Sequence, residues 1–367
     1  MKILHITNAI GWSGGMEQIS LLIQELHKRN HQNILVCPPT SELIPKLKTI
    51  PIHIEHLSMF QDYDLAAACR LYHLLKHNQP EIVHAHHPTA HAISLLALSL
   101  NLSPSFIVSR RVSFSLRANP FSKWKYRSKR IDRYSVVSKA VKETMIEGGV
   151  KPEKIEVVYS AFNQEKFINC SLNQKLKEEL KIPNDCKIVG KIANFSLWKG
   201  QHVFLEAAKL CLKKNPKIFF LLAGKETESL FPKTQELGIS KSVRLLGFRK
   251  DIPEILSILN LSVNSSIEGE GLSGALRESL ALGIPVVASN VSGNQEIVQD
   301  GITGFLAPVN DSEKLAEKIL FCLANEIQAK ECAKKGRDWV REHASCKVMV
   351  DHTLQLYQSA LKQRTNI

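Results

Sequence analysis

A glycine-rich turn in the second half of the chain carries the residue types best suited to binding a phosphorylated ligand. A buried strand is expected to end near Asn264, and a helix to begin around Gly274 with Ser273 as its N-cap and to end at Gly283. The backbone N–H groups of residues 272–275 then lack intrahelical partners and lie at the positive end of the helix dipole. This arrangement predicts a diphosphate site.

Two glutamates flank this turn, Glu270 just before it and Glu278 in the second turn of the helix. A carboxylate beside a bound anion is unfavourable unless hydroxyl groups donate hydrogen bonds to it, and sugar rings supply such hydroxyls. The alternative is a capped helix whose early acidic residues only stabilise the helix dipole. Spacing by itself does not decide between the two.

Alternating apolar runs and helical patterns surround this turn. Strands are expected at 2–7, 33–37, 81–85, 105–109 and 134–138, and again at 186–192, 217–223, 242–247, 260–264, 284–288 and 304–306, with helices between most of them. The pattern predicts an α/β fold with two Rossmann-like, doubly wound parallel sheets facing across a cleft. We expect an N-terminal domain at 1–160, a second domain at 161–345, and a C-terminal helix at 346–367 that packs back toward the first domain.

Composition narrows the classes of protein. The chain has 367 residues, 44% of them hydrophobic and 23% charged, which disfavours disorder and fibrous architectures. No apolar run is long enough to span a bilayer, the start lacks the pattern of a signal peptide, and the eight cysteines are scattered. We therefore expect a cytoplasmic protein with reduced thiols.

The net charge of +13 predicts an anionic partner. Cations interleaved with aromatic side chains concentrate between Arg110 and Arg133, a composition typical of an anionic membrane surface. A solvated helix face with an anion-binding loop is the plainer alternative. Nucleic acid is not expected, because no recognised binding motif accompanies the charge.

The segment from Glu270 to Glu278, together with the Ser-Leu-Ala-Leu-Gly-Ile-Pro-Val-Val-Ala that follows it, resembles the E-x7-E signature of the family 4 glycosyltransferases (glycosyl transferases group 1). Further matches follow in the expected order along nearly the whole chain: Gly14-Gly-Met-Glu17, Pro80-Glu-Ile-Val-His-Ala-His86, Val189-Gly-Lys-Ile-Ala-Asn-Phe195, Lys199-Gly200, Leu222-Ala-Gly224, Gly293-Asn-Gln-Glu296 and Asp300-Gly-Ile-Thr-Gly-Phe-Leu306. The resemblance implies the two-domain GT-B architecture, in which the domain at 161–345 binds the nucleotide sugar, and a retaining reaction.

The resemblance also implies roles for individual residues. Glu278 would accept hydrogen bonds from the donor ribose, and Glu270 would lie at the hydroxyls of the transferred sugar. Lys199, with Lys191, would neutralise the diphosphate, while the N–H groups of Gly271, Leu272, Ser273 and Gly274 and the Gly14-Gly15 loop would surround it. No cofactor or metal is then expected. The pair Asp62 and Asp64 fits a turn that starts a helix better than a metal site.

One departure concerns catalysis. Family members commonly place a first-domain histidine near the transferred sugar, whereas this chain has Arg110 and Arg111 at the end of the corresponding strand. An arginine binds phosphate or an anionic acceptor but is no general base at neutral pH. We expect Glu270, Lys199 and Arg110 to be the catalytic residues. His84, His86, His87 and His91 follow the preceding strand, and the alternation of His84 with apolar residues favours a core position for it.

These features predict an enzyme that moves a hexosyl or related sugar from a nucleotide-diphosphate donor, with a UDP-sugar favoured, to a hydroxyl of a glycolipid or lipopolysaccharide-type acceptor at the inner face of the cytoplasmic membrane. Two alternatives remain. A nucleotide-sugar 2-epimerase of the same architecture would convert the donor without an acceptor. A non-enzymatic membrane-binding protein would bind anionic vesicles but not nucleotide sugars.

Overall fold

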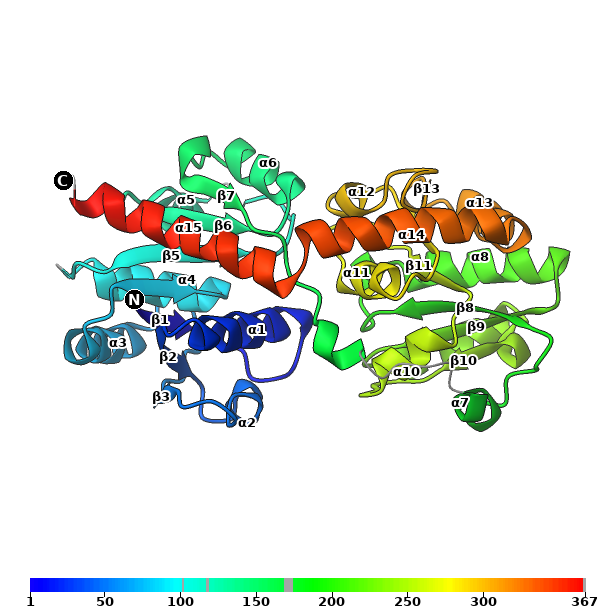
Figure 1. Cartoon of the computed structure of the whole chain (residues 1–367), viewed down its shortest axis with the longest axis horizontal. Helices are drawn as coiled ribbons and strands as arrows, with labels where there is room; N and C mark the ends of the chain where they lie inside the picture. Colours follow the sequence, from blue (N-terminus) through cyan, green and yellow to red (C-terminus); the bar gives the residue numbers. More distant parts are fainter. Residues whose placement is uncertain (101, 117–118, 168–173, 366–367) are drawn as a thin grey trace. The chain divides into compact units, whose positions relative to one another are not determined.

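The chain folds into two compact units, each built on one parallel sheet (Figure 1). The structure is a computed structural model that describes residues 1–100, 102–116, 119–167 and 174–365. Unit 1 comprises Met1–Ala161 and Cys346–Ile367, and unit 2 comprises Phe162–Ser345. We call them the first and second domains. The predicted boundary lay one residue earlier, because Ala161 is part of the first domain, where its backbone exchanges hydrogen bonds with the side chain of Gln18.

The first domain holds a seven-stranded sheet in the order β3-β2-β1-β4-β5-β6-β7. Its inner strands are mostly buried, as expected for a parallel sheet covered on both faces, whereas the edge strands β3 and β7 are partly exposed. The elements are β1 (Lys2–Ile6), α1 (Gly14–Lys28), β2 (Gln32–Cys37), α2 (Leu43–Lys46), β3 (His53–His56), α3 (Leu65–Asn78), β4 (Ile82–Ala85), α4 (Pro88–Leu98), β5 (Ser105–Arg110), α5 (Pro120–Arg127), β6 (Arg133–Val136), α6 (Lys139–Glu147), β7 (Ile155–Val157) and α15 (Cys346–Thr365).

The second domain repeats the scheme with six parallel strands in the order β10-β9-β8-β11-β12-β13. In both sheets the order in which successive strands are added reverses next to the first strand, between β1 and β4 and between β8 and β11. Ligands bind at such switch points in open α/β sheets. The elements are α7 (Gln174–Glu179), β8 (Lys187–Ile192), α8 (Gln201–Lys214), β9 (Ile218–Ala223), α9 (Phe231–Glu236), β10 (Val243–Leu245), α10 (Ile252–Ser257), β11 (Leu261–Asn264), α11 (Gly274–Ala281), β12 (Val286–Ser289), α12 (Asn294–Ile297), β13 (Phe305–Ala307), α13 (Ser312–Ala324) and α14 (Glu326–His343).

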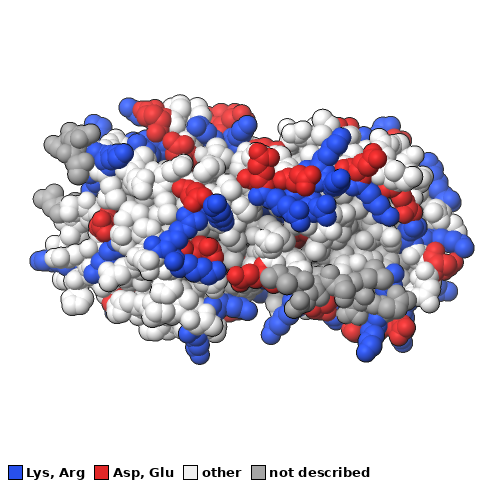
Figure 2. Space-filling model, in the orientation of Figure 1, with Lys and Arg blue, Asp and Glu red and all other residues white. Residues whose placement is uncertain are grey.

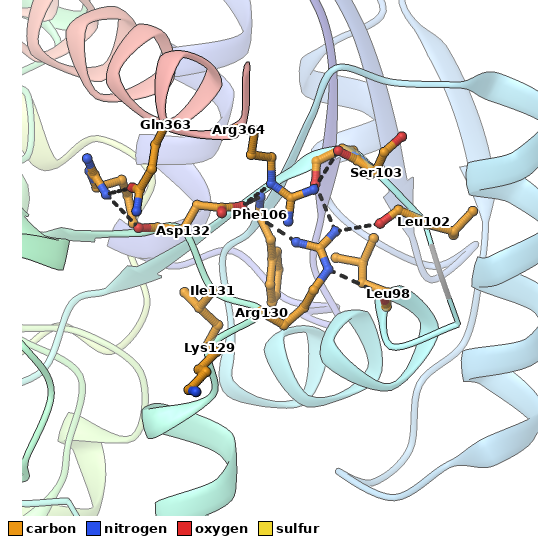
Figure 3. Close-up of polar contacts among 12 residues, drawn as sticks. Leu98, Leu102, Ser103, Phe106, Lys129, Arg130, Ile131, Asp132, Gln363 and Arg364 are labelled. Atoms are coloured by element: carbon orange, nitrogen blue, oxygen red, sulfur yellow. Dashed lines mark hydrogen bonds and ion pairs between the residues drawn. The ribbon is translucent and has the colours of Figure 1, made fainter. Parts of the chain in front are cut away.

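The C-terminal helix α15 packs on the first domain, alongside α1. Leu356, Tyr357 and Ala360 are buried against Ile3, Leu22 and their neighbours. At the far end of the helix, the Asp132 carboxylate accepts hydrogen bonds from Arg364 Nε at 3.0 Å and from the Phe106 backbone N–H at 2.7 Å (Figure 3). Helix α15 is therefore an integral part of the first domain, as the sequence predicted.

Helix α14 was not predicted from the sequence. Its buried positions hold small side chains, namely those of Ala329, Cys332, Ala333 and Gly336, and only Val340 is a larger aliphatic residue. Gly336 allows α14 to pack closely on α11, because a Cβ atom there would lie 2.6 Å from Leu280 Cδ2 and 2.8 Å from the Thr303 carbonyl oxygen. In the described residues, no helix is both long and apolar enough to cross a membrane.

Candidate functional site

The tip of α11 forms the centre of the candidate site. The helix begins at Gly274, and Ser273 caps it, since its Oγ accepts a hydrogen bond from the Leu276 N–H. Both features match the sequence-based prediction. Among the described residues, the backbone N–H groups of 271–275 find no acceptor. Their unsatisfied donors at the positive end of the helix dipole provide a ready site for an anion.

Glu270 lies beside this tip and is almost completely buried, at 4% exposure. Its Oε1 atom accepts hydrogen bonds from Lys199 Nζ at 2.6 Å, Ser266 Oγ at 2.6 Å and Asn264 Nδ2 at 3.2 Å. Burial alone would raise the pKa of this carboxyl, but the Lys199 charge and the three hydrogen bonds outweigh it and hold the pKa below its ordinary value. Glu270 is therefore ionised at neutral pH.

Asn264 joins these groups, although sequence reasoning assigned it no role. Its Nδ2 donates to the Glu270 carboxylate and, at 2.9 Å, to the hydroxyl of the capping Ser273. Its Oδ1 accepts from the Ser266 N–H and, at 3.4 Å, from Asn294 Nδ2. Asn264 is the last residue of β11, so its position at the carboxyl end of a strand next to the switch point was the available signal.

Two lysines lie near Glu270, and they differ in how they are paired. Lys199 donates to Glu270 and lies 4.0 Å from the centroid of the Trp198 ring. Lys191, in β8, is 2% exposed, and its ammonium group makes no hydrogen bond or ion pair with a described residue. Burial, and then the charge of Lys199, lower the pKa of Lys191 to about 7, while Glu270 acts in the opposite direction. A buried ammonium group without a counter-ion is costly, so this position favours an anionic ligand.

Glycines explain how the backbone reaches this geometry. Gly200 adopts φ +62°, and a Cβ atom there would lie 2.0 Å from the Ser265 carbonyl oxygen. The loop that carries Lys199 therefore approaches the loop after β11 more closely than it could with any side chain at position 200. At Gly293 a Cβ atom would lie 1.8 Å from the Gly271 carbonyl oxygen, so the loop before α12 supports the tip of α11 in the same way.

The second glutamate of the pair, Glu278, is half-buried in α11, one turn beyond the helix tip. Its neighbour Arg277 is buried and donates to the carbonyl of Ser273 at 3.4 Å. The structure thus gathers Lys191, Lys199, Glu270, Gly271, Leu272, Ser273, Gly274 and Glu278 around the carboxyl ends of β8 and β11.

In the first domain, Gly14 and Gly15 begin α1 at the carboxyl end of β1. Their N–H groups have no acceptor among the described residues, and Ser13 caps the helix. A Cβ atom at Gly15 would lie 3.9 Å from Arg111 Cδ and 3.9 Å from His87 Nε2. The glycine loop is therefore bordered by an arginine and a histidine of the same domain.

Arg110, which we expected to be catalytic, donates to the phenolic oxygen of Tyr126 at 3.1 Å and to the carbonyl of Phe114. Its guanidinium also lies over the Tyr126 ring. These contacts hold the local fold together. The arginine beside the Gly14-Gly15 loop is Arg111, whose NH1 and NH2 donate to the carbonyl oxygen and to Nδ1 of His86.

Three buried histidines, His5, His84 and His86, offer nitrogen atoms that all lie within 4.8 Å of one another. Imidazole nitrogens are common zinc ligands, but here each ring already makes directional hydrogen bonds. Both nitrogens of His84 are engaged, by Tyr357 and Ser109 at 2.6 and 2.7 Å. A metal ion would have to displace these contacts. The core position predicted for His84 is confirmed, since it is 1% exposed.

The acidic pair Asp62 and Asp64 serves the fold. Asp64 Oδ1 accepts from the Ala67 N–H at 2.9 Å and caps α3, as the sequence predicted. Asp62 pairs with the buried ammonium group of Lys125 at 2.6 Å. The pair is thus divided between a helix cap and an ion pair.

Much of the basic stretch from Arg110 to Arg133 is also used internally. Lys125 pairs with Asp62, Arg127 donates to the Gly148 carbonyl, and Arg130 donates to three backbone carbonyls near the start of β5 (Figure 3). Arg117 lies outside the described residues. On the face seen in Figure 2, basic and acidic side chains are interspersed over α14. The count of cations in this stretch therefore overstated its free positive charge.

Two family models match the chain. The model described as glycosyltransferase family 4 matches residues 13–166, and the model described as glycosyl transferases group 1 matches residues 173–339. The chain belongs to the family 4 glycosyltransferases.

Relatives of this glycosyltransferase act on different acceptors. It is 26% identical to the N-acetyl-alpha-D-glucosaminyl L-malate synthase of Bacillus anthracis, with 89% of this chain and 87% of the relative covered. It is also 26% identical to the UDP-Gal:alpha-D-GlcNAc-diphosphoundecaprenol alpha-1,3-galactosyltransferase of Escherichia coli, with 91% and 92% covered. The crystal structure of Anabaena Alr3699/HepE in complex with UDP and glucose superposes with a TM-score of 0.83 at 20% identity, covering 98% of this chain and 100% of that one. This likeness confirms the GT-B fold.

Proposed function

We propose that this glycosyltransferase transfers a hexosyl or related sugar from a nucleotide-diphosphate donor, with a UDP-sugar favoured, to a hydroxyl group of a glycolipid or lipopolysaccharide-type acceptor. The reaction retains the anomeric configuration and needs no metal. The proposal rests on two sets of donors in the same domain that have no acceptor among the described residues. They are the N–H groups at the tip of α11 and the buried ammonium group of Lys191.

Breaking the glycosidic bond of the donor transfers negative charge to the leaving diphosphate. Fixed N–H dipoles at 271–274, together with Lys191 and Lys199, stabilise this developing charge more than the charge of the intact donor. The lysines and the N–H dipoles thus supply the positive charge that a metal ion supplies in other enzymes. Lys199 and Glu270 are 2.6 Å apart, so both are held in place before the donor binds.

The two glutamates bind the uncharged parts of the donor. Glu278 accepts hydrogen bonds from the ribose hydroxyls, and Glu270 accepts them from the sugar being transferred. Both roles need an ionised carboxylate, and the lowered pKa of Glu270 is consistent with that requirement. The hydroxyls that these glutamates bind are absent from pyrophosphate, so the site favours the complete donor.

The first test is a nucleotide panel in which UDP, GDP, ADP and CMP are compared by thermal shift. A ligand at a hundredfold excess over its Kd adds about 2.7 kcal/mol to the free energy of unfolding, so the matching nucleotide stands out. Sugar transfer is then measured with and without acceptor. Turnover of the donor without an acceptor would indicate a 2-epimerase.

The variant Glu278→Ala tests the donor site in the sugar-transfer assay. We expect it to abolish transfer, while Glu313→Ala, an exposed change at the start of α13, leaves transfer at the wild-type rate. Normal transfer by Glu278→Ala would refute the assignment of the donor site.

A membrane location at the cytoplasmic face completes the proposal. Helix α5 exposes Phe121 and Trp124, whose ring centroids are 5.4 Å apart, next to the exposed Lys123. The Asp62–Lys125 ion pair ties the loop carrying the exposed Phe60 and Tyr63 to the same helix. Aromatic side chains beside cations are typical of surfaces that enter the headgroup region of a bilayer.

Co-sedimentation with vesicles tests this location. We expect binding to vesicles that contain anionic phospholipid, and at least tenfold weaker binding by the double variant Phe121→Ala/Trp124→Ala. Phe231→Ala, which removes an exposed aromatic side chain from the second domain, is the control. Equal binding of all three proteins would refute the role of Phe121 and Trp124, and no binding by the wild type would contradict the membrane location.

A further inference from the structure

Arg111 is a half-buried cation without an acidic partner. A guanidinium group has five N–H donors, and Arg111 uses only two of them in the contacts with His86, at 3.0 and 3.2 Å. No acidic side chain among the described residues lies within ion-pair distance of it. Its neighbours His84, His86 and His87 are neutral, because burial and then nearby positive charges, including that of Arg111, lower their pKa values. The charge of Arg111 is therefore left uncompensated.

A row of hydrogen bonds fixes the direction in which Arg111 is held. Since a guanidinium only donates, His86 Nδ1 must accept from it, and the proton of neutral His86 is then on Nε2. This Nε2 donates to His5 Nδ1 at 3.1 Å, which leaves the His5 proton on its own Nε2. His5 Nε2 in turn donates to Asn33 Oδ1 at 3.2 Å. The amide of Asn33 is oriented by its Nδ2, which donates to the His31 carbonyl at 3.0 Å.

The row therefore has one consistent protonation pattern, in which the ring N–H of each histidine meets an acceptor. His5 and His86 are 0% and 3% exposed, so solvent does not compete for these contacts. Such a row costs side-chain entropy and buries four polar groups, and it would be unnecessary if Arg111 only filled space. What it provides is a guanidinium fixed at the carboxyl ends of β4 and β5, beside the Gly14-Gly15 loop.

We propose that Arg111 binds the oxygens of a phosphate group at the Gly14-Gly15 loop, and that His86, His5 and Asn33 are positioning residues that hold it there. The N–H groups of Gly14 and Gly15, which have no acceptor among the described residues, complete the site. The inference rests on the proposed function for the source of the phosphate, which belongs either to the nucleotide donor or to a phosphorylated acceptor.

Calorimetric titration of the full-length protein tests the proposal, with Arg111→Met compared against the wild type. Arg130→Met is the control, because Arg130 is also a half-buried first-domain arginine, and backbone carbonyls hold it at the opposite end of β5. The probes are UDP, uridine, and inorganic pyrophosphate added both to the free and to the UDP-saturated protein.

If the donor supplies the phosphate, Arg111→Met weakens UDP binding by about tenfold to hundredfold, the loss expected for charged hydrogen bonds, and leaves uridine binding unchanged. If the acceptor supplies it, UDP binding is unchanged and pyrophosphate binding to the UDP-saturated protein falls by that factor. The proposal is overturned if Arg111→Met binds both phosphate probes as the wild type does, if the wild type binds neither, or if Arg130→Met loses as much. A wild type that binds pyrophosphate but no nucleotide would refute the proposed function instead, and pyrophosphate alone then decides the role of Arg111.

Two substitutions of His86 test the positioning role. His86→Leu removes the acceptor and should weaken phosphate binding as much as Arg111→Met does. His86→Asn places a carboxamide oxygen near the position of Nδ1 and should restore most of the affinity. If His86 had only a structural role, the two substitutions could change thermal stability in this order, but they would not change phosphate affinity in this order. Wild-type affinity in His86→Leu would overturn the positioning role.

Discussion

The Glu270 carboxylate and the Lys199 ammonium group lie 2.6 Å apart, and they reach this contact from the loops that follow two neighbouring strands, β11 and β8. The side chain of Lys199 is 21% exposed and that of Glu270 only 5%, so solvent reaches the pair from the lysine side. The contact therefore holds the lysine beside the tip of α11, where a diphosphate would meet it.

Replacing Glu270 by Gln should lower the free energy of unfolding at pH 7 by about 1.5 to 3 kcal/mol, as expected for a lost hydrogen bond to a charged group. The folded protein holds the pKa of Glu270 below that of the unfolded chain. As the pH falls, the unfolded chain therefore takes up the proton first. The ion pair stabilises the fold fully above about pH 4.3, and this stabilisation declines below that pH as the folded protein approaches its own lower pKa. Urea unfolding at pH 7, 5 and 4 measures the difference, which should shrink toward pH 4.

Lys187 and Glu326 provide the control for this prediction, because they are also 2.6 Å apart but are 41% and 42% exposed. Glu326→Gln should change stability by less than about 1 kcal/mol at every pH. A difference for Glu270→Gln that does not change with pH would contradict the prediction.

Binding of UDP should be accompanied by proton uptake at pH 8. The pKa of Lys191 is lowered to about 7, so the free protein holds this lysine mostly neutral at pH 8. A bound diphosphate raises that pKa and draws a proton from the buffer. Calorimetry in buffers of different ionisation enthalpy measures the uptake, which should approach one proton per site. Lys191→Met should abolish it.

Lys191→Met should also change the thermal stability of the protein in a way that depends on pH. Because the pKa of Lys191 is lower in the folded protein than in the unfolded chain, its charge opposes folding fully below pH 7, and the penalty disappears as the pH rises toward 10.4. Lys191→Met should therefore raise the Tm more at pH 6 than at pH 9. An equal gain at both would argue that Lys191 is not desolvated.

Gly200→Ala should reduce both stability and sugar transfer. Positive φ costs a non-glycine residue about 1 kcal/mol or more, and here the new Cβ would also meet the Ser265 carbonyl oxygen at 2.0 Å. Gly238→Ala is the matched control, since Gly238 has φ +72° but nothing within 4 Å of the added Cβ. Chemical unfolding and transfer assays should show a loss of activity only for Gly200→Ala.

Gly336→Ala should destabilise the protein, although alanine is the better helix former by about 1 kcal/mol. The added Cβ would lie 2.8 Å from the carbonyl oxygen of Thr303, which is backbone and has little room to move. The strain would be passed to α11 through Leu280. A lower urea midpoint, together with weaker UDP binding, is the expected result, whereas a gain in stability would refute this account of the α11–α14 contact.

Several parts of the fold could be predicted because they depend on local patterns. The strand ending at Asn264, the capping Ser273 and the helix start at Gly274 all follow from short-range rules about apolar runs, caps and glycine. Helix α14 was missed because its buried face is made mostly of small residues within a strongly polar sequence, although its apolar residues do recur with the period of a helix. Its packing depends on Gly336, and that role is visible only once Leu280 is placed against it.

The candidate site shows the same division. Lys199, Glu270 and Glu278 could be named because they lie in recognisable motifs, but the contact between Asn264 and Ser273 depends on the path of a loop. The row from Arg111 through His86 and His5 to Asn33 joins four segments that are distant in sequence. Nothing in the spacing of these residues distinguishes Arg111 from Arg110, and the side-chain directions that separate them follow from the tertiary structure.

The return of α15 to the first domain makes the second domain an insertion within the first. Residues 162–345 are one continuous piece and should remain folded when expressed separately. A fragment ending at Ala161 would instead expose the apolar surface around Ile3 and Leu22 and leave Asp132 without Arg364, so it should aggregate. A circularly permuted gene that starts at Cys346 and joins Ile367 to Met1 through a flexible linker would supply the first domain as a single uninterrupted segment.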